Sequence, residues 1–492
     1  MILSIDQGTT GTTAFVFDSS GTLVGRSYSE IPNYYPEPGW VEQDAEEIWQ
    51  VTQRVCTAAL QRADVYASEI KSVGITNQRE TTILWDRHTG EPVHRAIVWQ
   101  CRRSANICAQ FATEGKFEWL RARSGLLLDA YFSASKLLWL FREQPDLQAR
   151  ARKGELCFGT VDSWLIWKMS GARAHMTDHT NASRTLLYNL EEKSWDPELL
   201  ALFECPESIL PEIRSSAGYF VDTDPAAFAG VSAPICGVAG DQQAALFGQG
   251  CTNPGDLKNT YGTGCFMLAY AGEKHPEPPR GLLATIACDP HGLPGYAVEG
   301  SVFTAGSAIQ WLRDEMGLIQ RAVDSEIIAQ SIPNTRGVYL VPAFSGLGAP
   351  HWDSSARGTL CGLSRGAGRA EVVRATLESI AYQSDELARL MEEALKVDIS
   401  HMRVDGGASA NNFLMQFQAD ISDLRVERPR QIESTAIGAA LLAGIGSGLW
   451  HFHQLPERLL EIERDFLPGM PAEKRDSLLT GWKRAVAACK AF

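Results

Sequence analysis

The first 18 residues, MILSIDQGTTGTTAFVFD, constrain the fold of this chain more than any other stretch. Two apolar runs, residues 2–5 and 14–17, flank a turn made almost entirely of glycine and threonine. This pattern predicts a β-hairpin whose tip offers small residues, hydroxyls and free backbone N–H groups. Such a tip suits a phosphate, and Asp6 stands where a divalent cation would bind. Taken alone, the stretch fits an ordinary Gly/Thr turn equally well.

Length and composition narrow the class of protein. A chain of 492 residues is too long for one ordinary core and predicts two large domains. The net charge of -14 argues against a nucleic-acid surface, which needs clustered lysine and arginine. The eleven cysteines are scattered without a Cys-x-x-Cys pair, so we expect reduced thiols and no zinc site. Without a signal-like start or a long apolar run, the sequence predicts a cytoplasmic protein with no membrane insertion.

The rest of the first half reads as alternating strands and helices. Asp44, followed three residues later by Glu47, predicts the start of a helix over residues 45–63. A strand over residues 71–76 runs into the polar sequence NQRE at 77–80. A buried strand over residues 233–239 ends at Gly240 and Asp241, where a helix begins. These features predict an α/β domain.

A second Gly/Thr hairpin opens the other half of the chain. Residues 257–268 contain Tyr-Gly-Thr-Gly at 261–264 between apolar runs, after a Gly/Asn/Pro-rich stretch at 248–255 that suggests a domain boundary. A strand at 402–405, a glycine turn and a helix at 413–419 follow, and the small-residue helix at 438–448 suits close packing. Two halves that open alike predict a duplicated architecture with a nucleotide between them.

Asp241 is the candidate general base. The sequence lacks the P-loop and protein-kinase motifs, so any phosphoryl transfer must use other parts. A carboxylate at a helix start stays ionised in the field of the helix dipole and can orient an acceptor hydroxyl. The alternative is a simple helix cap, and the adjacent amides Gln242 and Gln243 favour the functional interpretation.

Other polar and aromatic residues suit a small polyol and a nucleotide. Arg79 and Glu80 offer donors beside an acceptor for neighbouring hydroxyls, although a plain ion pair is the alternative. Trp99, Tyr131 and Phe266 are candidates for an apolar wall, or else belong to the core. Gly407 and Asn411 both lie in the sequence GGASANN at 406–412. They would approach an adenosine, or else serve packing and helix capping.

Several long stretches together resemble one family, the FGGY carbohydrate kinases, and within it the members that phosphorylate glycerol. They include IDQGTT at 5–10, GITNQRETT at 74–82, AIVWQCRR at 96–103, TDHTNASRT at 177–185, AGDQQAALFGQ at 239–249, NTYGTGCFM at 259–267 and RVDGGASANNFLMQFQ at 403–418. The two family signature regions stand at 131–143 and 358–378. NQRE discriminates best, because sugar-specific relatives usually differ there.

The resemblance implies a two-domain, actin-like ATPase fold of the α/β class, with ATP and Mg²⁺ between the domains. Residues 1–248 would bind substrate and phosphate, and residues 249–492 the nucleotide. The glycerol contacts implied are Arg79, Glu80, Trp99, Tyr131, Asp241, Gln242 and Phe266, with Asp241 as the base. The nucleotide contacts implied are Thr9, Thr10, Gly11, Thr263, Gly306, Gln310, Gly407 and Asn411, with Asp6 at the metal. A homodimer or homotetramer is expected.

The chain departs from the family pattern in two places. Gly11 and Thr13 replace a serine and an arginine, so one cation near the terminal phosphates is missing, and we expect weaker nucleotide binding or slower transfer unless another cation compensates. Residues 223–234 lack the Lys, Arg and His on which regulation by fructose 1,6-bisphosphate or by histidine phosphorylation depends in some relatives. We therefore expect neither kind of control.

Two other functions remain open from the sequence. One is a related kinase for a ketopentose or erythritol, which would use the same ATP machinery. The other is a non-catalytic nucleotide switch on the actin-like fold, which the presence of Asp241 disfavours. The Ala-rich C-terminal helix, from residue 473, is either a docking element or a solvated surface.

Overall fold

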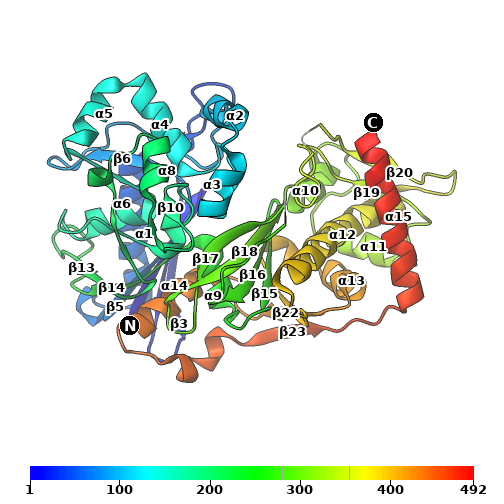
Figure 1. Cartoon of the computed structure of the whole chain (residues 1–492). Coiled ribbons are helices and arrows are strands. Elements are labelled where there is room, and N and C mark those ends of the chain that lie inside the picture. Colours follow the sequence, from blue (N-terminus) through cyan, green and yellow to red (C-terminus); the bar gives the residue numbers. More distant parts are fainter. Residues whose placement is uncertain (280, 354, 492) are drawn as a thin grey trace.

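The computed structural model describes residues 1–279, 281–353 and 355–491, which form two α/β halves (Figure 1). The sheet of the first half has the order β13 (Ala217–Asp222), β14 (Pro234–Gly240), β5 (Ser72–Asn77), β1 (Ile2–Gln7), β2 (Gly11–Phe17), β3 (Leu23–Glu30). The sheet of the second half has the order β17 (Leu283–Cys288), β18 (Pro294–Val302), β16 (Cys265–Gly272), β15 (Leu257–Tyr261), β21 (His401–Asp405), β22 (Arg425–Pro429), β23 (Ile462–Phe466).

Helices and short strands complete the two halves. The α-helices are α1 (Ala45–Ala63), α2 (Ala105–Thr113), α3 (Phe117–Ser124), α4 (Ser133–Glu143), α5 (Pro145–Arg152), α6 (Val161–Met169), α7 (His179–Ala182), α8 (Pro197–Leu202), α9 (Asp241–Gly248), α10 (Gly306–Asp314), α11 (Asp324–Gln330), α12 (Arg369–Leu395), α13 (Asn412–Ser422), α14 (Ser434–Gly446) and α15 (Ala472–Ala491). Short strands pair as β4 (Glu42–Gln43) with β7 (Ala96–Ile97), β6 (Ile83–Asp86) with β8 (Leu156–Gly159), β9 (Met176–Asp178) with β12 (Glu212–Arg214), β10 (Tyr188–Asn189) with β11 (Ser194–Trp195), and β19 (Tyr339–Val341) with β20 (Thr359–Cys361). The 3₁₀ helices are η1 (Ala67–Glu69), η2 (Glu207–Ile209), η3 (Gly407–Ala410), η4 (Phe452–Gln454) and η5 (Glu457–Leu459).

The two sheets repeat one pattern of strand pairing. In the first, β3, β2 and β1 are antiparallel neighbours, β1, β5 and β14 run parallel, and β13 is antiparallel at the edge. In the second, β18, β16 and β15 are antiparallel, β15, β21 and β22 run parallel, and β23 closes the edge antiparallel; β17 is added beyond β18. The duplication predicted from the two hairpins is therefore confirmed in the order and direction of the strands.

Helices α9 and α14 cross at very short range between the halves. A Cβ atom on Gly438 would lie 1.8 Å from the carbonyl oxygen of Ala244, and one on Gly248 would lie 2.1 Å from that of Ser434. Helix α14 also lies against the first sheet, where a Cβ on Gly74 would lie 2.3 Å from the carbonyl oxygen of Ala439. In Figure 1 the orange α14 accordingly sits with the N-terminal half, although it comes late in the chain. The prediction that this helix serves packing is confirmed.

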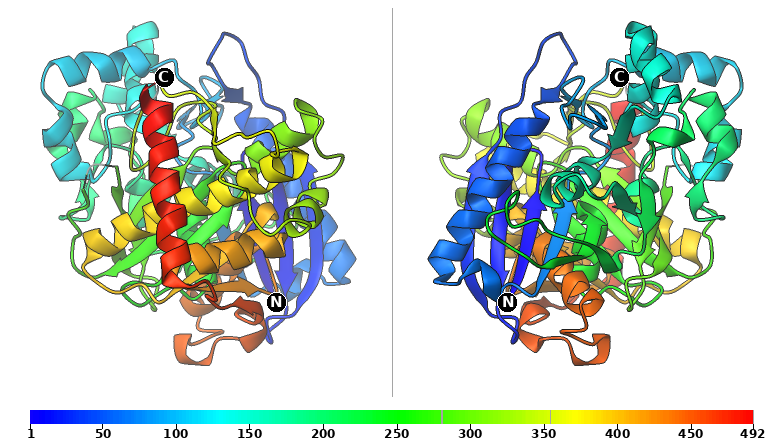
Figure 2. Two further views of the ribbon diagram at one scale, coloured as in Figure 1. Left: turned by 90° about the vertical axis from the view of Figure 1, so that its right-hand side faces the viewer. Right: turned by 90° about the vertical axis from the view of Figure 1, so that its left-hand side faces the viewer.

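A side-chain cap fixes the start of α1, and ring packing holds α15 against the second half. Asp44 caps α1 through the N–H groups of Glu46 and Glu47, as predicted, whereas the Glu47 carboxylate accepts a hydrogen bond from the hydroxyl of Tyr34. The C-terminal helix α15 lies across α12 (Figure 2), and Trp482 stacks on Tyr382 with ring centroids 5.2 Å apart. One face of α15 is thus part of the core of the second half rather than fully solvated.

In the described part of the chain, all the cysteines are free, and all but Cys361 are buried. None of the described helices has the length and apolarity that a membrane span requires.

We predict that Gly438→Ala destabilises the protein by about 3 kcal/mol, because the new methyl group meets backbone that cannot move aside. Alanine's better helix propensity, about 1 kcal/mol, opposes this change but is smaller. Urea unfolding followed by circular dichroism measures the difference. Gly469→Ala is the matched control, because its Cβ would lie 3.8 Å from the Asp420 carboxylate, and its effect should stay within about 0.5 kcal/mol. Equal stability of the two variants would contradict the close crossing.

Candidate functional site

The turn between β1 and β2 is anchored by its carbonyl oxygens. The side chain of Gln43 donates to the Thr9 oxygen at 2.7 Å, and the Ile31 N–H donates to the Thr10 oxygen at 3.0 Å. Within the described residues, the N–H groups of Thr9 and Thr10 have no hydrogen-bond partner. Fixed, unpaired N–H groups in a tight turn form an anion-binding concavity.

The turn between β15 and β16 is built in the same way. The N–H of Gly306, at the start of α10, donates to the Gly262 oxygen at 3.0 Å, and the N–H of Ala305 donates to the Thr263 oxygen at 2.9 Å. The N–H groups of Thr263 and Gly264 are again without a partner among the described residues. A Cβ on Gly306 would lie 2.5 Å from the Gly262 oxygen, so only glycine permits this close approach. Gln310 lies further along α10 and is exposed.

Asp6 lies partly buried near the end of β1, directly opposite Thr13 of β2. Its carboxylate accepts a hydrogen bond from the Thr435 hydroxyl on α14, so the residue links strand and helix. Burial, reinforced by the nearby charge of Asp241, raises the pKa of Asp6 to about 7. The described residues contain no group of three acidic, His or Cys side chains suited to a metal. Asp6 alone fits Mg²⁺ that takes its other ligands from phosphate and water.

Arg79 and Glu80 lie in a strained turn after β5. Glu80 has a positive φ of 62°, which is costly for a residue with a side chain. The Ser133 hydroxyl holds this backbone by donating to the Glu80 carbonyl oxygen at 3.0 Å. The turn buries both residues, Arg79 to 3% exposure and Glu80 to 1%, and brings their side chains to the same site.

Asp241 is the first residue of α9, beside the Arg79 guanidinium. The Arg79 Nε lies 3.2 Å from the Asp241 Oδ1, which also accepts a hydrogen bond from the Gln242 N–H at 2.7 Å. A Cβ on Gly240 would lie 2.8 Å from the Arg79 side chain, so this glycine makes room for the contact. The Asp241 side chain is 30% exposed, whereas that of Arg79 is 2% exposed, so Asp241 is open to a ligand.

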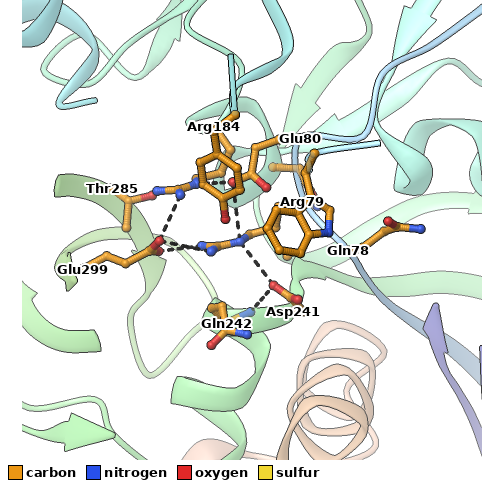
Figure 3. A network of polar contacts seen from close by, with 12 residues as sticks. Gln78, Arg79, Glu80, Arg184, Asp241, Gln242, Thr285 and Glu299 are labelled. Carbon is orange, nitrogen blue, oxygen red and sulfur yellow. Dashed lines mark hydrogen bonds and ion pairs between the residues drawn. The ribbon is translucent and has the colours of Figure 1, made fainter. Parts of the chain in front are cut away.

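Two residues that the sequence did not single out complete this cluster (Figure 3). Glu299 of β18 accepts two hydrogen bonds from the Arg79 guanidinium, at 2.6 and 3.1 Å. The Arg184 Nε donates to the Glu80 Oε1 at 2.6 Å, and its Nη2 donates to the Glu299 Oε1 at 2.9 Å. We call Arg79, Glu80, Arg184 and Glu299 the charge quartet.

The members of the charge quartet differ in their electrostatics. Burial alone would raise the pKa of Glu299, but Arg184 and Arg79 outweigh it and lower that pKa to about 2. Burial raises the pKa of Glu80, because the two arginines compensate it less fully. The Glu80 Oε2 has no hydrogen-bond partner among the described residues, so it remains available to a ligand hydroxyl.

Aromatic side chains stand beside the quartet. The rings of Trp99 and Tyr131 meet edge to face with centroids 5.4 Å apart, and the Trp99 Nε1 donates to the Thr9 hydroxyl at 2.8 Å. This bond ties the aromatic pair to the first turn. Phe266 lies on β16 opposite Ser301, and no ring contact joins it to the pair among the described residues.

The side-chain oxygen of Gln242 accepts a hydrogen bond from a buried cation. The Lys258 Nζ of β15 donates to the Gln242 Oε1 at 2.5 Å and to the Thr260 hydroxyl at 2.8 Å. Burial lowers the pKa of Lys258, while Asp405 and Asp241 oppose that shift. Lys258 therefore places a positive charge between the two halves that the sequence analysis missed.

Gly407 and Asn411 lie after β21. A Cβ on Gly407 would meet nothing within 4 Å, so this backbone is open to close approach. Asn411 caps α13 by accepting from the Leu414 N–H at 3.0 Å, and its Nδ2 reaches the Ser325 hydroxyl at 3.3 Å. Asn411 thus caps a helix, which is the alternative role that the sequence left open for it.

The missed residues left weak signals in the sequence. Arg184 falls inside the stretch TDHTNASRT, Glu299 is a charged residue in the mostly apolar strand sequence PGYAVEGSV, and Lys258 stands in the strand sequence LKNTY. A charge inside a buried strand requires a partner, and that requirement is the signal.

Comparison with known proteins shows to which family the chain is similar. Residues 1–248 match the N-terminal domain, and residues 257–447 the C-terminal domain, of the FGGY family of carbohydrate kinases. The chain is 50% identical to a glycerol kinase of Symbiobacterium thermophilum, over 100% of this chain and 98% of that protein.

Solved structures have the same fold. The crystal structure of Plasmodium falciparum glycerol kinase with ADP superposes with a TM-score of 0.93 at 35% identity, covering 99% of this chain and 98% of that chain. A ligand-bound xylulose kinase from Lactobacillus acidophilus has a TM-score of 0.89 at 21% identity, over 100% of this chain and 98% of that chain, and so shares the fold. The predicted two-domain, actin-like fold is confirmed, and the chain belongs to the FGGY family of carbohydrate kinases.

Proposed function

We propose that this protein is a glycerol kinase, which converts ATP and glycerol to ADP and sn-glycerol 3-phosphate. The observation that carries the proposal is the meeting of Arg79, Glu80 and Asp241 at one site. The site contains donor, acceptor and base for neighbouring hydroxyls. Similarity to glycerol kinases along the whole chain supports the choice of glycerol.

Each polar group of the site has a task in this proposal. Glu80 accepts a hydrogen bond from one glycerol hydroxyl at its free Oε2, and Arg79 donates a hydrogen bond to another hydroxyl. Trp99, Tyr131 and Phe266 contact the carbon chain, and Gln242 donates through the amide nitrogen that Lys258 leaves free. A pocket fitted to three carbons with several hydroxyls disfavours longer sugars.

Asp241 acts as the general base. Its carboxylate takes the proton of the attacking hydroxyl as the oxygen forms its bond to the γ-phosphorus and the bond from that phosphorus to the ADP oxygen breaks. Its open side, away from Arg79, provides room for this hydroxyl. Exclusion of water is required, because water is a competing acceptor.

The two hairpin turns would hold the phosphates of ATP from both halves. We assign residues 1–248 to substrate and phosphate binding, and residues 249–492 to the nucleotide. In the first half Thr9, Thr10 and Gly11 serve the phosphates; in the second, Thr263 and Gly306 do so, while Gln310, Gly407 and Asn411 lie toward the adenosine. Asp6 would hold Mg²⁺, which neutralises phosphate charge when it is bound.

Assembly, location and regulation are further parts of the proposal. Membership of the family supports a cytoplasmic homodimer or homotetramer. Residues 223–234 connect β13 to β14 without Lys, Arg or His, so activity should not change with fructose 1,6-bisphosphate.

A substrate panel tests the function. We predict MgATP-dependent ADP release with glycerol, and little with dihydroxyacetone, erythritol or xylulose. Asp241→Asn should lower kcat by about a thousandfold, the range that a lost general base gives, while the variant still binds glycerol. Turnover on xylulose or erythritol alone would assign the fold to another substrate, and ATP binding without any turnover would favour a nucleotide switch.

Thr13→Arg tests the missing cation. Because Thr13 lies opposite Asp6, an arginine there would bring a positive charge to the phosphate side of the first turn. We predict a KM for ATP lower by about tenfold, the equivalent of one charge-assisted hydrogen bond. Thr13→Gln, long but neutral, is the control and should not give this gain. Unchanged KM and kcat in Thr13→Arg would show that the missing cation does not limit nucleotide binding or transfer.

Asp6→Asn tests the metal role. We predict that the Mg²⁺ concentration for half-maximal rate rises by about tenfold or more, because an amide binds the cation more weakly than a carboxylate. The KM for glycerol should not change. Asp18→Asn is the control, since Asp18 forms a turn with Ser20 and Thr22 at the far end of β2. An unaltered Mg²⁺ dependence in Asp6→Asn would remove Asp6 from the metal site.

A further inference from the structure

The charge quartet joins the two halves of the protein at the substrate site. Glu299 belongs to β18 in the second half, whereas Arg79, Glu80 and Arg184 all come from the first. All four side chains are buried, with exposures between 0 and 3%. Two guanidinium groups and two carboxylates make the quartet neutral, which is the condition for burying charge at low cost.

Glu299 determines which way the Arg79 guanidinium faces. Its two oxygens take the two terminal nitrogens of Arg79, and Gln243 accepts from Nη1 as well, at 3.1 Å. Only the Nε edge is left toward Asp241, at 3.2 Å, and toward Glu80, at 3.7 Å. A planar guanidinium held on one edge by two parallel hydrogen bonds cannot turn without breaking both.

Arg79 would otherwise pair more fully with Asp241. Asp241 is the nearest carboxylate outside the quartet, and a two-bond ion pair with it would occupy the oxygens that a substrate hydroxyl needs. Glu299 limits this closure because it holds both terminal nitrogens on its own side, so that Asp241 meets Arg79 only at the Nε edge. It also neutralises part of the charge that would draw the Asp241 carboxylate inward.

Arg184 performs the corresponding task for Glu80. It bonds the Glu80 Oε1 through Nε and the Glu299 Oε1 through Nη2, so it fixes both carboxylates at once. The Glu80 Oε2 is thereby left free, and the guanidinium lies over the rings of Tyr131 and Phe132, at 5.8 and 5.2 Å from their centroids. The base, the acceptor and the aromatic wall are therefore aligned by one set of contacts.

We propose that Glu299, with Arg184, is a positioning residue of the substrate site, which keeps Arg79 from closing onto Asp241. This inference rests on the proposed function for its kinetic consequences and on geometry for the rest. Glu299 does not touch the reacting atoms; it acts through Arg79. Because it comes from the other half, the site is correctly arranged only when β18 lies against the NQRE turn.

The test uses Glu299→Gln, which keeps the shape and removes the charge. We predict a kcat for glycerol lower by about a hundredfold, the cost of misplacing reacting groups by about 1 Å, and a raised KM for glycerol. The KM for ATP should stay within about twofold, since the nucleotide contacts lie elsewhere. Glu299→Asp keeps the charge and should restore part of the rate. A general loss of folding would instead lower the apparent kcat through a smaller active fraction and leave both KM values unchanged.

Glu427→Gln is the matched control. Glu427 is a buried carboxylate of the same sheet, and it also pairs with two arginines, Arg403 at 3.0 Å and Arg425 at 3.1 Å, but outside the site. It should alter stability and leave kcat and both KM values unchanged. Equal kinetic effects of Glu299→Gln and Glu427→Gln would overturn the positioning role.

A crystal structure of Glu299→Gln gives a second readout that is independent of activity. We expect the Arg79 terminal nitrogens to turn and pair with both oxygens of Asp241. An Arg79 that keeps its place in this variant overturns the inference, whichever substrate the enzyme accepts. If the wild-type protein fails to phosphorylate glycerol but Arg79 turns as expected, the proposed function fails and the positioning role of Glu299 stands. Should Glu299→Gln not fold, Glu299→Asp decides the question: its carboxylate is one methylene shorter, so a partial turn of Arg79 toward Asp241 should accompany a partial loss of rate, and an unmoved Arg79 with a lowered kcat would overturn the inference.

Discussion

The close crossing of α9 and α14 is the constraint on which the rest of the structure depends. Glycines at the contact let one helix backbone lie directly on the other, so no side chain determines the separation of the two halves. Asp241 stands at the start of α9, and Thr435, near the start of α14, bonds Asp6. The same crossing therefore fixes the candidate base, Asp241, and the candidate metal ligand, Asp6, relative to each other, although 235 positions separate them in the sequence.

Buried charge is the second organising element. A neutral set of four ionised groups gains little stability over apolar residues of the same size, because desolvation offsets the attraction. Its value lies in direction: guanidinium and carboxylate groups bond at defined angles, which apolar contacts do not impose. The strained turn at Glu80 is held open by such contacts, so local strain and buried charge occur at the same place, where function requires fixed geometry.

Local patterns in the sequence predicted the framework well. The Gly/Thr hairpins, the Asp44 cap and the strand that ends at Gly240 follow from residue spacing and turn chemistry, which act over a few residues. The duplicated strand order also followed, because both halves open with the same hairpin. Arg184 and Glu299 could not be predicted, since their partners are up to 220 residues away in the sequence. The site residues taken from the family resemblance lie in two groups, around the quartet and around the turns, and their roles remain predictions.

The anchoring of both turns through carbonyl oxygens has a consequence for how this protein tolerates genetic change. Backbone N–H groups are present whatever side chain the codon specifies, so the donors that Thr9, Thr10 and Thr263 offer to an anion do not depend on the side chains at those positions. Proline is the exception, because it lacks the N–H. The glycines of the two turns tolerate less, because a Cβ on Gly11 would lie 2.6 Å from the Ser29 carbonyl oxygen and one on Gly264 would lie 2.3 Å from that of Val302. The part of the site that the two halves share most closely thus consists of main-chain groups, which a change of side chain at the threonine positions leaves in place.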